Sequence, residues 1–141
     1  MPKEKNSRMW ASWIIWAVVI LALSRFMAGE QQVSVAVGTE GLSFKTESGY
    51  TSQLGWDDIS ALEVRADFAY GTLVEGTDTD KEKSGIWTND ALGEYELIAE
   101  AKISACIICS TRSGRVVAFN FESEESTRSL YEAIQEKITG I

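Results

Sequence analysis

Two hydrophobic patterns divide the chain near residue 30. Sixteen uncharged residues follow one another from Met9 to Ser24, whereas from Glu30 onward apolar and polar residues alternate in short runs. As a helix, the first run extended to Gly29 would be about 31 Å long, close to the thickness of the hydrocarbon core of a membrane. The pattern therefore predicts an N-terminal hydrophobic helix followed by a domain rich in β-strands.

The N-terminal segment has the features of a membrane anchor. Trp10 and Trp13 lie near its start, where indole rings favour the membrane interface, and Arg25 can extend its charged end toward the headgroups. We predict that residues 1–29 form a cytoplasmic tail and a transmembrane anchor. The residues expected to hold this anchor in the bilayer are Trp10, Trp13, Trp16, Ile20 and Arg25.

Positive charge sets the expected orientation of this anchor. Lys3, Lys5 and Arg8 precede the apolar run, whereas Arg25 alone lies at its far end. The positive-inside rule therefore places the N-terminus in the cytoplasm and the domain outside the cell membrane. A cleaved signal peptide is the alternative, because the same three cations and the small residues of Ala22-Leu23-Ser24 also fit a signal peptidase site.

After residue 30 the alternation predicts about seven short antiparallel strands and then one helix. One of these strands is expected to run through Val64, after a kink or turn at Asp57-Asp58. The runs QVSVAVG and GLSFKT flank a turn at residues 38–41, and the runs CIICST and RVVAFNF flank Ser113-Gly114, as in two β-hairpins. Beyond Ser123 the apolar spacing becomes helical, with Leu130, Ile134 and Ile138 on one face. We therefore expect residues 30–141 to form a mainly β sandwich or partly open barrel, with the C-terminal helix covering one end.

The charge of the domain limits its partners. The whole chain has a net charge of −8, and residues 30–141 contain nine Lys and Arg against twenty Asp and Glu. So acidic a surface is expected to repel nucleic acid and phosphoinositide headgroups. The predicted partners are the lipid bilayer, through the N-terminal helix, and a protein partner or self-association.

Candidate catalytic and metal-binding residues are few. The chain has no histidine, which excludes Ser-His-Asp and Cys-His catalysis and zinc sites that use imidazole. Cys106 and Cys109 form a C-x-x-C sequence, but on a strand their sulfurs point to opposite faces. Cys109 is expected to face the core on the same strand as Ile103, Ala105 and Ile107. The run TDTDKEKSG lacks an EF-hand pattern and is expected to be a solvated loop or hairpin tip.

Three stretches resemble the bacterial pleckstrin-homology-like (PH-like) domains, many of which are fused to short membrane segments. They are LGWDDISALEV, GIWTNDALGEYEL and CIICSTRSGRVVAFNFESEESTRSLYEAI, and the resemblance covers Val33 to Ile138. The positions that carry it are Trp56, Ile59, Gly85, Gly93, Tyr95 and the terminal strand pair with its helix. The resemblance implies a seven-stranded β-sandwich or partly open barrel with a capping helix, and a role in interaction or assembly. Eukaryotic relatives of the family bind phosphoinositides through a basic first hairpin, whereas Lys45 is the one cation near this hairpin.

Together these observations predict a single-pass membrane protein that displays a non-catalytic interaction or scaffold module for protein partners. We expect no cofactor, no metal and no catalytic residue. The candidate partner seam is the place where the helix bearing Leu130, Ile134 and Ile138 meets a sheet edge, because a partner strand could add there. Two alternatives stay open: an exported soluble module released by signal peptidase, and a hydrolase that uses paired carboxylates such as Asp57 and Asp58.

Overall fold

The computed structural model of the chain describes residues 31–139. The predicted anchor, including Trp10, Trp13, Trp16, Ile20 and Arg25, lies outside the described residues. Within residues 31–139, no helix is both long and apolar enough to cross a membrane. The described residues comprise almost all of the predicted β domain.

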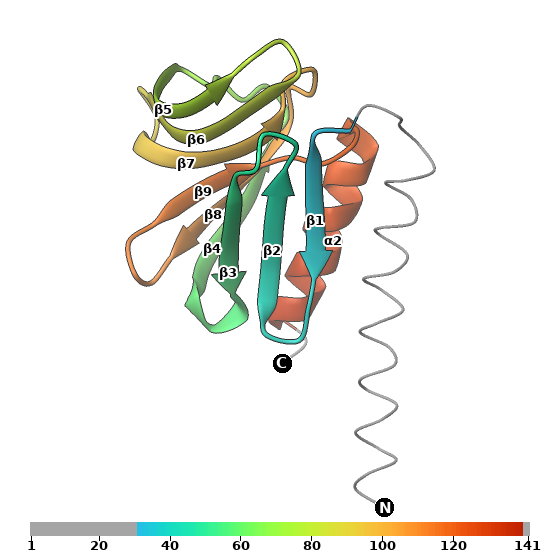
Figure 1. Cartoon of the computed structure of the whole chain (residues 1–141). Coiled ribbons are helices and arrows are strands. Elements are labelled where there is room, and N and C mark those ends of the chain that lie inside the picture. The colour runs from blue at the N-terminus through green and yellow to red at the C-terminus, as the bar shows by residue number, and fades with distance from the viewer. Residues whose placement is uncertain (1–30, 140–141) are drawn as a thin grey trace, which may run out of the picture.

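Residues 31–139 contain nine strands, which form two sheets, and one α-helix, which lies at the C-terminal end of the domain (Figure 1). The first three strands form an antiparallel sheet in the order β1-β2-β3, and the other six form a larger sheet in the order β4-β8-β9-β7-β6-β5. A short 3-10 helix, η1, connects the two sheets. The elements are β1 Val33–Val37, β2 Gly41–Thr46, β3 Thr51–Gly55, η1 Trp56–Asp58, β4 Ile59–Arg65, β5 Thr72–Asp78, β6 Glu82–Asn89, β7 Gly93–Glu100, β8 Cys106–Thr111, β9 Val116–Phe119 and α2 Glu124–Thr139.

The main core lies between the small sheet, one face of the large sheet and α2. Three valines of β1 point into it, because alternate residues of a strand face the same side. Phe44 of β2 meets Phe119 of β9 with 4.7 Å between the ring centroids. From α2, Leu130 and Ile134 enter the core and are 3% and 0% exposed. The predicted C-terminal helix with an apolar stripe is therefore confirmed.

A second core covers the opposite face of the large sheet. It contains Trp87 of β6 and the rings of Phe68 and Tyr95, which meet edge to face with 5.6 Å between their centroids. Strands β7, β8 and β9 are covered on both faces, so their buried parts are nearly continuous apolar runs. Cys106 lies in the second core and Cys109 in the main core. The prediction that the two sulfurs point to opposite faces is confirmed.

The number of strands and the direction of one pair differ from the sequence-based prediction. Nine strands replace the expected seven. The predicted turn at Asp57-Asp58 is present as part of η1, and the strands on either side of it, β3 and β4, belong to different sheets. The expectation of a purely antiparallel domain is wrong for β9, which pairs antiparallel with β8 but parallel with β7. The reason is that the β8–β9 hairpin inserts β9 into the middle of the large sheet, beside a strand from a distant part of the chain.

Local turns agree more closely with the prediction. The β1–β2 and β8–β9 hairpins are both present, and Gly114 in the second turn has a φ of 94°, a conformation that glycine adopts without strain. The sequence pattern places Ile103 and Ala105 on the same strand as Ile107, but β8 begins only at Cys106. Both residues are nevertheless buried, in the connection that precedes the strand.

Replacing Cys106 or Cys109 by alanine should lower the free energy of unfolding by about 1–2 kcal/mol each, because both side chains are fully buried and their loss leaves a small cavity. The sequence alone indicates a larger cost at Cys109, which was expected to face the core. Because the structure buries Cys106 in the second core and Cys109 in the main core, we expect the two costs to be similar. Burial also raises the pKa of the Cys106 thiol to about 12 and that of the Cys109 thiol to about 11, so both stay protonated at neutral pH.

Urea unfolding of the single and double cysteine variants measures these costs, with Ser110→Ala on the same strand as the control. Zinc or iron bound to the purified protein, and lost from the double variant, would contradict a purely structural role.

Candidate interaction site at the edge of the large sheet

The three residues of the predicted partner seam lie on the core-facing side of α2. Leu130 and Ile134 are buried in the main core, and Ile138 is half-buried against it. These side chains therefore hold the helix in place. The sheet edge beside them is β4, since α2 contacts β4 and its neighbour β8. The addition of a partner strand at this edge stays a prediction.

β4 is an edge strand that is regular over most of its length. Within the described residues it pairs with β8 alone. A bulge between Ile59 and Ala61 interrupts the ladder at its start, and from Ala61 to Arg65 the register is continuous. An extended, regular segment at an open edge is a template for pairing with another strand.

The register identifies which backbone groups of β4 face outward. Thr111 of β8 donates its N–H to the carbonyl of Arg115, across the β8–β9 turn, at 2.9 Å. Cys109 and Ile107 lie at even spacing from Thr111 on the same strand, so their backbone N–H and C=O groups also point toward β9. Leu62 and Val64 lie opposite these two residues in the β4–β8 ladder. They therefore turn their N–H and C=O groups away from β8, toward the edge of the sheet.

The side chains of this edge form an apolar face and a charged face. Leu62 and Val64 are half-buried on the side of the main core. On the opposite face Glu63 and Arg65 form a solvent-accessible ion pair, with 3.2 Å between Arg65 Nη2 and Glu63 Oε1. Such a pair contributes only about 0–1 kcal/mol to stability. The edge therefore offers hydrogen-bonding groups with apolar surface on one side and two opposite charges on the other.

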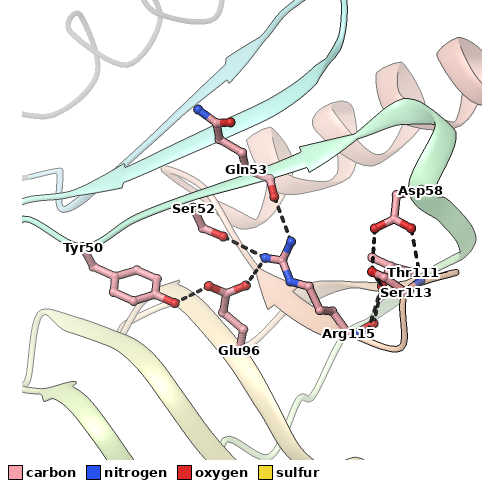
Figure 2. A network of polar contacts seen from close by, with 8 residues as sticks. All are labelled: Tyr50, Ser52, Gln53, Asp58, Glu96, Thr111, Ser113 and Arg115. Atoms are coloured by element: carbon pink, nitrogen blue, oxygen red, sulfur yellow. Dashed lines mark hydrogen bonds and ion pairs between the residues drawn. The ribbon is translucent and has the colours of Figure 1, made fainter.

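The edge of the small sheet at β3 is occupied by an arginine (Figure 2). Arg115 donates to the carbonyl of Gln53 and to the hydroxyl of Ser52, both at 3.1 Å. It also forms an ion pair with Glu96 of β7, with 2.6 Å between Nη2 and Oε1. The Tyr50 hydroxyl donates to the other oxygen of Glu96, and burial and this hydrogen bond raise the pKa of Tyr50, so the donor stays protonated. The network joins β3 to the large sheet.

Asp58, at the end of η1, holds the turn from which Arg115 comes. Its two carboxylate oxygens accept the N–H and the hydroxyl of Ser113 at 3.1 and 2.8 Å (Figure 2). Within the turn, the Arg115 N–H donates to Thr111 Oγ1 at 2.8 Å. Asp58 is one of the two paired carboxylates that a hydrolase was expected to use, and here its side chain stabilises a turn.

The outer strand β5 is bent and acidic. A bulge at Val74 breaks its register with β6, and Gly76 has a φ of 141°. Its charged residues are the carboxylates Glu75 and Asp78. Bulges and charges of one sign are features that protect an edge strand from pairing.

Two buried carboxylates hold the small sheet against the large one. Glu82 of β6 and Glu100 of β7 lie opposite each other in the ladder and are 3% and 4% exposed. Glu100 Oε2 accepts the N–H groups of Gln32 and Val33, at the start of β1, at 2.7 and 2.6 Å. Glu82 accepts the N–H and the hydroxyl of Ser48, in the turn after β2, at 3.1 and 2.5 Å.

The pKa values of these two carboxylates shift in opposite directions. Burial raises the pKa of Glu100 by more than its hydrogen bonds lower it. Burial also acts on Glu82, but hydrogen bonds from Ser48, Ser84 and Thr46 outweigh it and lower the pKa of Glu82. The run TDTDKEKSG, which was expected to be a solvated loop or hairpin tip, is exposed as a turn only at residues 79–81. Glu82 of the same run turns inward to accept these hydrogen bonds.

An open pocket of about 510 Å³ lies between the β4–β5 loop and the β6–β7 turn. Asp67, Phe68, Asn89 and Asp90 are among its lining residues, and Asn89 Nδ2 is engaged in a 2.8 Å hydrogen bond to the carbonyl of Ala69. Across residues 31–139, no three Cys, Asp or Glu side chains come together as ligands for a metal ion.

No family model, curated protein or solved structure matches the chain. The assignment of the candidate site therefore depends on the geometry of β4 and its neighbours alone. The sequence pattern indicated the helix beside the site and a strand through Val64, but not that this strand lies at an edge of the sheet. The alternation of Leu62, Glu63, Val64 and Arg65 is the available signal of a strand with two different faces, but nothing local shows that this strand lies at an edge.

Glu82→Gln should lower the free energy of unfolding by about 1–3 kcal/mol at pH 7, because a charged acceptor of several hydrogen bonds is replaced by a neutral one. The folded-state pKa of Glu82 lies below its ordinary value of 4.5, so the stabilisation is complete above pH 4.5 and is lost as the pH falls through the folded-state pKa. The difference between wild type and variant should therefore shrink under acidic conditions.

Urea unfolding between pH 7 and pH 3 measures this difference. Glu75→Gln on the exposed strand β5 is the control and should change the stability by less than about 0.5 kcal/mol. A penalty for Glu82→Gln that is the same at both ends of the pH range would show that its charge is not the stabilising feature.

Proposed function

We propose that this chain is a single-pass membrane-anchored module whose PH-like β domain binds a protein partner and carries out no reaction. The observation that carries the proposal is the open edge of β4 beside α2. Leu62 and Val64 turn their backbone groups outward there, and their half-buried side chains would be covered by an added strand. Strand addition to a sheet edge is a common mode of peptide recognition, in which the backbone supplies affinity and the side chains supply specificity.

The resemblance to PH-like domains is supported by the arrangement of the elements. Two sheets enclose one core, and the C-terminal helix packs its apolar stripe into that core. The nine strands and the parallel β7–β9 pair distinguish this domain from a seven-stranded antiparallel sandwich. The proposal therefore takes from the family the general architecture and the interaction role.

The junction with the proposed anchor supports a domain held in a fixed orientation. Glu100 binds the N–H groups of Gln32 and Val33, only a few residues after the end of the hydrophobic segment. Because this carboxylate is buried in the large sheet, the point where the chain enters the domain is fixed to the body of the protein. The acidic domain would be repelled by anionic headgroups, which keeps its surface available to a protein. We place it outside the cytoplasm, at the cell membrane.

The anchor is tested by fractionating cells that make the full chain. We expect the protein in the membrane fraction, resistant to carbonate extraction, with an N-terminal sequence that begins at or near Met1. Replacing Val18 and Leu21 by arginine should release it, because each charge in the middle of a membrane helix costs about 2.5–3.5 kcal/mol. A soluble protein whose sequence begins at Arg25 would favour the exported module released by signal peptidase.

The partner edge is tested with a photo-crosslinking amino acid placed in the full chain in cells. At Glu63 on β4 we expect crosslinked products of higher mass. At Glu75 on β5, the matched control on an exposed but bent edge, we expect none. Products at neither position, or equally at both, would show that β4 is not the interaction site.

A further inference from the structure

We propose that the partner strand at β4 is β4 of a second copy of this chain, paired antiparallel about Val64. This inference rests on the proposed function, which places a protein partner at this edge. In a two-fold symmetric dimer the same surface is used by both copies, so the edge has to be complementary to itself. The charges, the backbone and the side chains of β4 each meet this condition.

The charge pattern of β4 is complementary to its own reverse. When Val64 lies opposite Val64 of the second copy, Glu63 lies opposite Arg65 of the second copy and Arg65 lies opposite Glu63. Opposite charges directly across two antiparallel strands stabilise their pairing, and like charges destabilise it. The 3.2 Å ion pair between Glu63 and Arg65 within one strand confirms that the two side chains share a face. On that face the second copy would present the matching charges.

The backbone of β4 satisfies the same symmetry. Val64 turns its N–H and C=O groups outward, so two copies of Val64 can exchange both hydrogen bonds. Leu62 would then lie opposite Ala66 of the second copy, a small exposed residue in the bend that follows β4, so the pairing of strand with strand spans Glu63 to Arg65. On the apolar face Leu62 and Val64 of the two copies would meet and extend the main core across the interface.

Other registers and other edges fit a second copy less well. Pairing about Glu63 would place two carboxylates opposite each other. Pairing about Leu62 would place Glu63 opposite Ala61 and leave both charges unmatched. Self-pairing of β5 would bring together Glu75 and Asp78 on a bent strand, and at β3 Arg115 already binds the carbonyl of Gln53.

Disulfide crosslinking of the full chain in membranes tests the register. The two Cα atoms of a hydrogen-bonded antiparallel pair are about 5.5 Å apart, and those of a non-hydrogen-bonded pair about 4.5 Å, both within the range for a disulfide. With Cys106 and Cys109 replaced by alanine and a mild oxidant added, Val64→Cys should form a dimer of the chain. Glu63→Cys should not crosslink alone, but should crosslink with Arg65→Cys when the two variants are made together.

Charge reversal tests the energetics of the same contact. Glu63→Arg alone places like charges opposite each other, and we expect it to reduce dimer formation about tenfold. The double variant Glu63→Arg, Arg65→Glu restores both opposite pairs and should dimerise within about threefold of the wild type. Glu75→Arg on β5 changes the net charge by the same amount as Glu63→Arg and should leave dimer formation unchanged. Sedimentation in detergent gives the dimer fraction, and the thermal unfolding temperature confirms that each variant is folded.

The results separate this inference from the proposed function. A Val64→Cys dimer with rescue by the double charge swap supports both. Photo-crosslinks from residue 63 to a different protein, without a Val64→Cys dimer, would overturn the second copy and keep the interaction module. Self-crosslinking of Glu63→Cys would overturn the proposed register, and the absence of any crosslink at β4 would overturn both proposals.

Discussion

The position of β9 in the middle of the large sheet is the constraint on which the rest of the structure depends. This strand joins β8 to β7, and without it β4-β8 would separate from β7-β6-β5. Its residues serve both cores, since Val117 and Phe119 enter the main core while Ala118 enters the second one. All three are fully buried. A short apolar strand thus organises both layers, because each of its faces is covered and each of its edges is paired.

Buried polar groups then fix how the two sheets lie against each other. A buried carboxylate is costly unless donors satisfy it, and Glu82 and Glu100 obtain these donors from the turn after β2 and from the start of β1. Asn120 has a similar role beside β9: it is fully buried, and it accepts the N–H of Glu100 at 2.6 Å. Because these groups are satisfied only in one arrangement, they define the position of the small sheet more narrowly than apolar packing does.

The proposed interaction edge follows from how the other edges are used. β1 is held by Glu100, β3 is bound by Arg115, and β5 is bent by a bulge. β4 keeps a regular outer segment in which Leu62 and Val64 alternate with Glu63 and Arg65. The edges at β3 and β5 thus carry features that oppose pairing, and β1 is bound at its first residue, whereas β4 is regular. Such a difference between edges would make pairing selective, and this selectivity is what an interaction module requires.

The sequence by itself determined the features that depend on residues a few positions apart. Turn residues located both hairpins, the spacing of Leu130 and Ile134 located the buried face of the C-terminal helix, and strand periodicity placed Cys106 and Cys109 on opposite faces. Only the tertiary structure decided that β9 lies parallel to β7, that Glu82 turns inward and that β4 forms an edge. These outcomes depend on which strands meet from distant parts of the chain. A carboxylate in an acidic run, such as Glu82, has the same local pattern whether it faces water or finds its donors in another sheet.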